Sequence, residues 1–548
     1  MRTSNDQSRI LFLHFFRRFF DNDTIRVEGD TTTTIARAIG TVAAPGLLVA
    51  FFLQNQYPKR TLWGRIEDQY FFVLLSFVVM GVVTIFEWEM LFPDRIDFLV
   101  LTPLPLVRKQ LMESKALALA CFLLVFLVGS NCLGAIVFPV ICLAPIARQM
   151  FAHIVAVGLA GMFSSCAVLA AVALIRCCLP DRLFRLATPL LQAVLTAMLV
   201  LLVIQYARYG ESIHTLASRP TVARWVPTIW FLAVYDHLLY GSTAPSFATD
   251  LCSRAYYACG GSIALVLLLY PVTWARMHKM SIEGTLSRAG SRWNSLQRLI
   301  DAGVRQPAER AMFHFLGQTI VRNPRYQVYL AMYAGTGLSL AAACAFGLRS
   351  SPAGLVPTAS IFGGHAVVPL LVFWAVAGLH TAFAFPTTLS ARWVFRVSGV
   401  DSRALVAGAA KWTILVTMLV WGVSLWSISR LGWSGRALLV QIAFGMCLAI
   451  LLTDAFFLAR RIPLIEPRLP GRTNFALFLT LYIGVLAPAI FCVIWSELRI
   501  ERSLWMLIPF FAMTLGCHIV FRAFLRTPME EEEWMEGYEG EFQLLNLS

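Results

Sequence analysis

The feature that most constrains this chain is a series of apolar runs, each about 20 residues long and nearly free of charge. A run of this length matches the hydrocarbon core of a bilayer, which is about 30 Å thick. Inside lipid every backbone N–H and C=O group must be satisfied within its own element, so such runs must fold as helices. Only 14% of the residues are charged, against about 25% in soluble proteins. We therefore expect an all-α polytopic membrane protein.

Twelve runs meet this description. They cover residues 35–56, 69–91, 116–137, 150–175, 186–206, 256–275, 326–346, 366–385, 411–429, 438–458, 475–495 and 504–521. Lys and Arg gather in alternate connections, with nine of them between Arg276 and Arg325. Basic residues mark the cytoplasmic side of membrane proteins. The pattern predicts a multi-pass protein of the cytoplasmic (inner) membrane with both termini in the cytoplasm. It also accounts for the net charge of +14 without nucleic acid as a partner.

The basic stretch divides six expected spans from six. The predicted parts are a first half at 1–277, a basic cytoplasmic linker at 278–325, a second half at 326–522 and an acidic C-terminal tail at 523–548. Short similarities recur across the divide, separated by 290 to 296 residues. They match Pro93 with Pro386, Arg108 with Arg403, Lys115 with Lys411 and Leu179-Pro180 with Leu469-Pro470. We interpret this as a duplication, and six spans per unit predict a parallel repeat about an axis along the membrane normal.

A basic, aromatic segment precedes the first span. Its phenylalanines recur at i, i+3, i+4 and i+7, and its basic residues take the other face, a pattern typical of a helix that lies in the membrane interface. The residues are Phe12, Phe15, Phe16, Arg17, Arg18 and Phe19. A counterpart begins at Pro307, in the linker before the seventh span, and ends at Asn323-Pro324. We predict an interfacial elbow helix at the start of each half.

The connection after the second span combines charge, apolar side chains and proline. Its distinctive residues are Asp94, Arg95, Ile96, Asp97, Phe98, Leu101, Pro103 and Pro105. The first of these predict a short helix, and the two prolines force a break before the third span. We expect the apolar members, Ile96, Phe98 and Leu101, to contact a cytoplasmic partner, with Arg95 and Asp97 on an exposed rim.

A second unusual segment lies in the expected external connection between the fifth and sixth spans. Residues 224–240 are too short to cross a bilayer and are rich in Trp and Tyr, which favour the membrane interface. The segment predicts a re-entrant or surface-lying helix. Its marker residues are Trp225, Pro227, Trp230, Phe231 and Tyr235.

Motifs for chemistry are missing from the sequence. There is no G-x-x-x-x-G-K-[ST] phosphate loop, no H-E-x-x-H and no G-x-S-x-G. Ionisable residues within the spans are few, and we interpret His380 and His518 as packing residues near the inner side. We expect no enzyme activity, catalytic residue, metal or cofactor in this chain itself. Energy for any driven process would then come from elsewhere.

With these residues in view, the segment from Phe92 through Leu104-Pro105 to Lys115 resembles the connection between the second and third spans in the permease subunit of the type-2 ABC exporter family. The elbow helices and the external aromatic segment fit the same plan. The resemblance implies ATPase-coupling segments at 94–104 and 387–403, the second represented by Arg392, Phe395 and Arg396. It also implies cytoplasmic ATPase subunits as partners, which bind the ATP.

The halves differ from each other in that comparison. The second coupling segment lacks the acidic residues of the first, and no aromatic segment joins the last two spans. We therefore expect the halves to be functionally unequal.

The favoured function is the membrane-spanning permease of an ATP-driven exporter, with a substrate that helices this apolar do not define. An ion-coupled secondary transporter is the alternative, although Asp94-Arg95 lacks the flanking glycines common in that class. A membrane-embedded enzyme or a scaffold without transport also stays open, but no set of acids, histidines or metal ligands supports catalysis.

Overall fold

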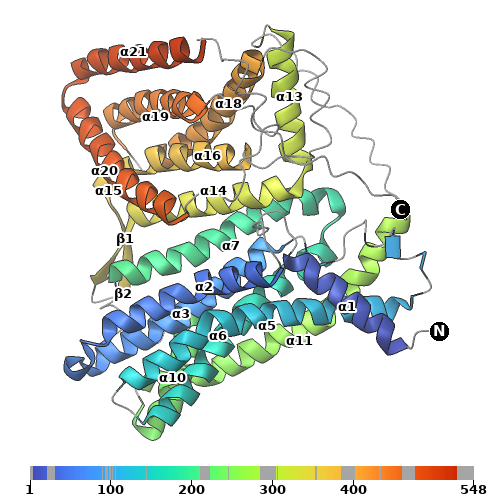
Figure 1. Cartoon of the computed structure of the whole chain (residues 1–548). Helices are drawn as coiled ribbons and strands as arrows, with labels where there is room; N and C mark the ends of the chain where they lie inside the picture. The colour runs from blue at the N-terminus through green and yellow to red at the C-terminus, as the bar shows by residue number, and fades with distance from the viewer. Residues whose placement is uncertain are drawn as a thin grey trace. The chain divides into compact units, whose positions relative to one another are not determined.

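The structure, a computed structural model, describes residues 4–20, 31–88, 90–92, 97, 100–101, 103–104, 106–142, 145–209, 223–244, 246–283, 304, 306–351, 354–383, 402–430, 433–459 and 475–526. Among these residues, ten helices are long and apolar enough to cross a membrane. Figure 1 shows the chain as a succession of such helices. A helical, multi-pass membrane protein is therefore confirmed at this level.

The first part of the chain forms α1 (Ser4–Phe20), α2 (Thr31–Leu53), α3 (Leu62–Phe86), α5 (Arg108–Ile141), α6 (Ile146–Cys178), α7 (Asp181–Tyr209), α10 (Pro227–Tyr240) and α11 (Ser246–Glu283). The second part forms α13 (Pro307–Arg322), α14 (Pro324–Ala345), α15 (Ile361–His365), α16 (Val367–Phe383), α18 (Ser402–Ser429), α19 (Gly435–Phe456), α20 (Phe475–Arg502) and α21 (Leu507–Arg526). Short 3₁₀ turns lie at Tyr57–Lys59, Gly241–Thr243, Phe457–Ala459 and Leu504–Met506.

Each of the twelve predicted spans falls on a helix. The ten candidate spans match ten of the predictions. The other two, residues 35–56 and 475–495, correspond to α2 with 23 residues and α20 with 28. They are not among the ten, and the part of α2 from Ile39 to Leu53 is counted as a shorter apolar helix. The six-plus-six repeat stays a prediction.

Several helices are much longer than the apolar runs that predict them. α5, α6 and α11 contain 34, 33 and 38 residues. At about 1.5 Å per residue they measure roughly 50 to 57 Å, well beyond the roughly 30 Å of hydrocarbon. These helices therefore carry their polar ends outside the lipid core.

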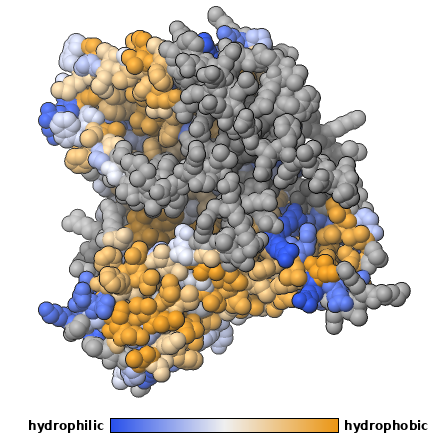
Figure 2. Space-filling model, viewed as in Figure 1, coloured by the Kyte–Doolittle hydropathy of each residue, from blue (hydrophilic) through white to orange (hydrophobic). Residues whose placement is uncertain are grey.

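The surface agrees with a membrane environment. In Figure 2 hydrophobic residues cover much of the coloured surface, and hydrophilic residues gather in smaller patches. Leu186, Leu267 and Leu419 are 70%, 69% and 63% exposed. Apolar exposure on this scale would be costly in water.

One element departs from the all-α prediction. β1 (Phe346–Ser351) and β2 (Gly354–Ala359) pair as an antiparallel hairpin that joins α14 to α15. The register sets Phe346 opposite Ala359 and Ser351 opposite Gly354. The strands are six residues each and lack a clear polar–apolar alternation, so periodicity gave no signal for them.

The helices cluster into two compact units. Unit 1 comprises Met1–Ser291, Ile320–Val367 and Leu469–Ile483, and unit 2 comprises Arg292–Thr319, Val368–Arg468 and Gly484–Ser548. The boundaries of these units differ from the predicted domain boundaries. The predicted domains stay a prediction.

Within unit 1, α14 packs along α7, α3 packs on α6, and α2 packs on α5 (Figure 1). Gly335 explains the closeness of the first pair, because a Cβ atom there would lie 2.5 Å from the backbone oxygen of Ala193. Small residues let helices approach closely in membranes. Within unit 2, α19 packs against α18 and α21.

Candidate functional site

The first elbow helix packs on the third predicted span. α1 confirms the predicted helix, and it lies against α5 in Figure 1. The rings of Phe19 and Phe122 stack with their centroids 4.8 Å apart, and Phe20 stacks on Phe126 at 6.4 Å. Phe15 and Phe19 are only 2% exposed. This face of α1 is therefore covered by protein.

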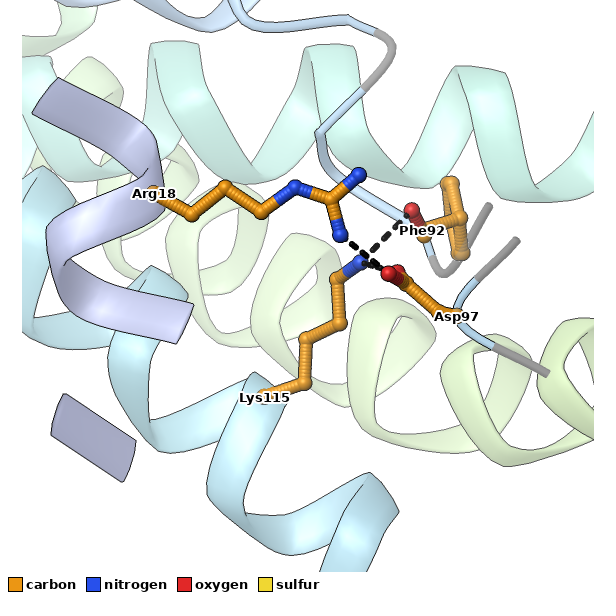
Figure 3. Close-up of polar contacts among 4 residues, drawn as sticks. All are labelled: Arg18, Phe92, Asp97 and Lys115. Carbon is orange, nitrogen blue, oxygen red and sulfur yellow. Dashed lines mark hydrogen bonds and ion pairs between the residues drawn. The ribbon is translucent and has the colours of Figure 1, made fainter. Parts of the chain in front are cut away.

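A buried charge cluster joins this elbow helix to the segment between α3 and α5 (Figure 3). Lys115 Nζ, on α5, donates hydrogen bonds to Asp97 Oδ2 at 2.9 Å and to the carbonyl oxygen of Phe92 at 3.0 Å. Arg18, on α1, forms an ion pair with the other carboxylate oxygen of Asp97. We call Arg18, Asp97 and Lys115 the elbow junction; Asp97 lies 18 residues from Lys115 and 79 from Arg18.

Burial makes the elbow junction energetically important. The side chains of Asp97 and Lys115 are 4% and 3% exposed, whereas that of Arg18 is 31% exposed. The Lys115 ammonium also lies 5.2 Å from the centre of the Phe15 ring, a favourable cation–π distance. Removing one member of a buried pair leaves the other charge uncompensated, at a cost of about 3–5 kcal/mol. Asp97 is thereby a strong anchor for its segment.

The position of Asp97 corrects one expectation. It does not lie on an exposed rim, because α5 and α1 each supply it with a cation. Its neighbour Leu101 is half-buried against the apolar core that contains Phe92, rather than turned outward.

Apolar residues of this segment other than Leu101 are exposed. Val100, Leu104 and Val107 are 60%, 48% and 60% exposed, and Pro103 beside them is exposed as well. We call these three residues the apolar ridge. The predicted coupling residues Asp94, Arg95, Ile96, Phe98, Pro105, Arg392, Phe395 and Arg396 lie outside the described residues.

A related junction occurs in the second part of the chain. Lys411, on α18, forms an ion pair with Glu309 on the second elbow helix, α13. The two helices approach closely, because a Cβ atom on Gly408 would lie 2.4 Å from the Glu309 backbone oxygen. The Lys411 side chain is 38% exposed and that of Glu309 is 11% exposed. Lys411 is also the residue that matches Lys115 in the internal repeat predicted from the sequence.

The external aromatic segment forms α10, a 14-residue helix that starts at Pro227. α10 packs against α3, α6 and α11. Phe231 and Tyr235 are fully buried, Trp230 is half-buried, and Trp225 is 87% exposed. The helix is thus inserted among three others and does not lie on their surface.

Polar contacts accompany this insertion. Gln149 Nε2, on α6, donates to the Tyr235 hydroxyl at 2.8 Å, and Tyr70 and Thr228 share a hydrogen bond of 2.8 Å. Asp236 is fully buried, and neither carboxylate oxygen has a hydrogen-bond partner among the described residues.

Sequence reasoning missed the partners in both junctions. The matching positions of Lys115 and Lys411 in the two predicted halves are the signal that the sequence offers for these junctions. Arg18 and Asp97 are 79 residues apart, so no local pattern could join them. No group of three or more metal-ligating residues occurs in the described part of the chain.

Comparisons with known proteins add no assignment. No family model, no curated protein and no solved structure matches this chain. The described helices define the class of this chain as a helical, multi-pass membrane protein.

Proposed function

We propose that this chain is the permease of an ATP-driven exporter, energised by separate ATPase subunits that contact the segment between α3 and α5. One observation carries the proposal. This segment is anchored by a buried ion pair and at the same time exposes the apolar ridge of Val100, Leu104 and Val107.

A segment that transmits force must be firmly attached to the helices that it moves, and the ion pairs of Asp97 provide this attachment. Asp97 is joined to α5 through Lys115 and to α1 through Arg18. A displacement applied to the segment would thus reach the third predicted span directly, without first being absorbed by a loose loop. The stacking of Phe19 on Phe122 adds a second connection between the same two helices.

The apolar ridge would be stabilised by contact with a partner protein, because the contact would remove its side chains from water. It precedes Arg108 and Lys109, the first residues of α5, so it adjoins the charged end of that helix. Exposed apolar side chains rimmed by charged residues mark a contact with protein or with membrane, and the proposal assigns this one to a protein partner. In the proposal this end faces the cytoplasm, as the basic residues predict, and both termini lie on the same side of the inner membrane.

In the proposal the energy comes from ATP bound outside this chain. A phosphate loop is absent from the printed sequence, so ATP would bind to the partner subunits. Segment 387–403 would provide the second contact. The function therefore requires at least one additional subunit.

The test replaces the apolar ridge with charge. The triple variant V100D/L104D/V107D should lose co-purifying ATP hydrolysis, with ATPase affinity reduced on the order of 100-fold, or about 2.8 kcal/mol. A carboxylate is costly in a desolvated apolar contact but harmless at an exposed position. Affinity purification from native membranes, followed by an ATP hydrolysis assay, gives the measurement.

The control is V100A/L104A/V107A, which shortens the side chains without adding charge and should retain a measurable part of the affinity. Both variants must elute at the parent position in size-exclusion chromatography. If the parent purifies without ATPase activity, or if the triple Asp variant binds as well as the parent, the proposal is wrong.

A further inference from the structure

The carboxylate of Asp236, on α10, has no compensating partner in the described part of the chain. Its side chain is fully buried, neither carboxylate oxygen has a hydrogen-bond partner there, and it forms no ion pair there. An isolated carboxylate is so costly in an apolar environment that it is neutralised or paired. Asp236 therefore needs a cation or a proton that the described side chains do not supply.

Asp236 lies on the side of α10 that packs against α3. Leu232 and Ala233 precede it by four and three positions, so the three residues share one side of the helix. Leu232 and Ala233 belong to one apolar cluster with Ile66 and Tyr70 of α3, which also includes residues of α11. The carboxylate is therefore placed where α10 meets α3.

An amide oxygen of α3 is unpartnered at the same contact. Gln69 is 1% exposed, and its Oε1 atom has no hydrogen-bond partner among the described residues. The Gln69 side chain contacts the hydroxyl of Tyr240, on which the Asp236 charge also acts. Tyr240 follows Asp236 by one turn and is half-buried, and helical side chains lean toward the N-terminus, so its ring extends back toward Asp236. We call Asp236, Gln69 and Tyr240 the oxygen site.

The atoms of the oxygen site select the kind of ligand. They are two carboxylate oxygens, an amide oxygen and a phenol oxygen, and ligands of oxygen alone suit hard cations. A monovalent cation balances the single negative charge, whereas a divalent cation leaves a buried positive charge, which is costly. Arg65, one turn before Gln69 on α3, also acts on Tyr240 and adds to the positive charge nearby. The chemistry therefore favours Na⁺ over Ca²⁺ or Mg²⁺.

From this geometry we propose that Asp236, Gln69 and Tyr240 bind a Na⁺ ion between α3 and α10. The ion neutralises the Asp236 carboxylate and is the partner that both unpartnered acceptors lack. Because its ligands come from two helices, the ion also fixes α10 to α3. No local motif marks the oxygen site, since Gln69 and Asp236 lie far apart in the sequence. The inference does not depend on ATPase coupling.

The experiment measures the thermal stability of the purified full chain in detergent at constant pH. Sodium chloride replaces N-methylglucamine chloride stepwise, so that the ionic strength stays fixed. We expect a saturable rise in the melting temperature with Na⁺, because a ligand that binds only the folded state stabilises it. Calcium and magnesium chloride at the same ionic strength should give a smaller rise.

D236N tests the acid directly. It should remove the dependence on Na⁺ and should melt above the parent in the Na⁺-free buffer, because asparagine carries no charge that needs compensation. Q69L should raise the Na⁺ concentration of the half-maximal shift at least tenfold, because it removes the amide oxygen. D250N is the matched control, since Asp250 is an exposed acid of the neighbouring helix α11, and it should respond to Na⁺ as the parent does.

All variants are first checked for a parent-like elution volume in size-exclusion chromatography. The proposal is overturned if Na⁺ does not raise the melting temperature of the parent, which would mean that a proton neutralises Asp236. It is also overturned if Ca²⁺ or Mg²⁺ matches the effect of Na⁺, or if D236N responds to Na⁺ as the parent does.

Discussion

A lysine at the matching position of each predicted half forms an ion pair, but its acidic partner belongs to a different kind of element in each half. At the elbow junction, Lys115 of α5 pairs with Asp97, which belongs to the segment before α5. In the second part of the chain, Lys411 of α18 pairs with Glu309, which belongs to the elbow helix itself. Lys115 and Lys411 occupy matching positions in the two predicted halves, but their acidic partners lie on different elements.

This difference explains the sequence of the second segment. Residues 387–400 contain no acid, which on sequence grounds separates them from the first coupling segment. The ion pair of the lysine is nevertheless present, because α13 supplies the carboxylate. In the first part the pair fixes the segment to α5, whereas in the second it fixes the elbow helix to α18. The two lysines therefore anchor different elements, and the duplication stays a prediction.

The largest effect should come from Asp97→Ala. Lys115, 3% exposed, would remain charged and buried without its carboxylate, so we expect a loss of about 3–5 kcal/mol in unfolding free energy. Thermal unfolding in detergent, followed by size-exclusion chromatography, measures it. The double variant D97N/K115M should recover much of the loss, since neither charge is then left alone. A D97A protein as stable as the parent would contradict the buried pair.

A smaller effect is expected for Lys411→Ala. The Lys411 side chain is 38% exposed, so water compensates part of the lost interaction, and the cost should be about 1 kcal/mol. Lys115→Ala, measured in the same thermal assay, is the matched comparison and should cost several times more. Equal losses for the two lysines would show that the junctions do not differ as their burial indicates.

Arg18→Ala should have the smallest effect on stability. Its guanidinium is 31% exposed, and Asp97 retains Lys115 when Arg18 is removed. We expect a change of about 0–1 kcal/mol, measured as a small shift in the detergent melting temperature. Arg17→Ala is the control, because Arg17 lies on the exposed side of the same helix. A loss as large as that of D97A would mean that Arg18, not Lys115, is the main partner.

The sequence predicted what depends on local pattern. Phe12, Phe15, Phe16 and Phe19 predicted the helix α1 through their spacing, and the aromatic segment 224–240 predicted a short helix where α10 lies. The apolar runs located the spans because their length is set by the bilayer. These features need only residues that are close together in the chain.

The sequence did not predict what depends on distant contacts. In the sequence Asp97 resembles an exposed acid of a loop, whereas in the structure Arg18 and Lys115 contact it. His518 resembled a packing residue, although it contacts Asp454 from another helix, 64 residues away. The apolar ridge was also missed, because hydropathy alone cannot decide which of Leu101 and Leu104 turns toward the core.

The burial of α10 has a consequence for the order of assembly during synthesis. A helix of 14 residues is about 21 Å long, too short to be inserted across the membrane by itself, and it contains the buried Asp236. One of the helices that encloses it, α11, follows it in the chain. The packing of α10 can therefore be completed only after α11 has been synthesised. Its docking is a late step of folding, and a nascent chain that ends before α11 would leave Phe231 and Tyr235 without their final contacts.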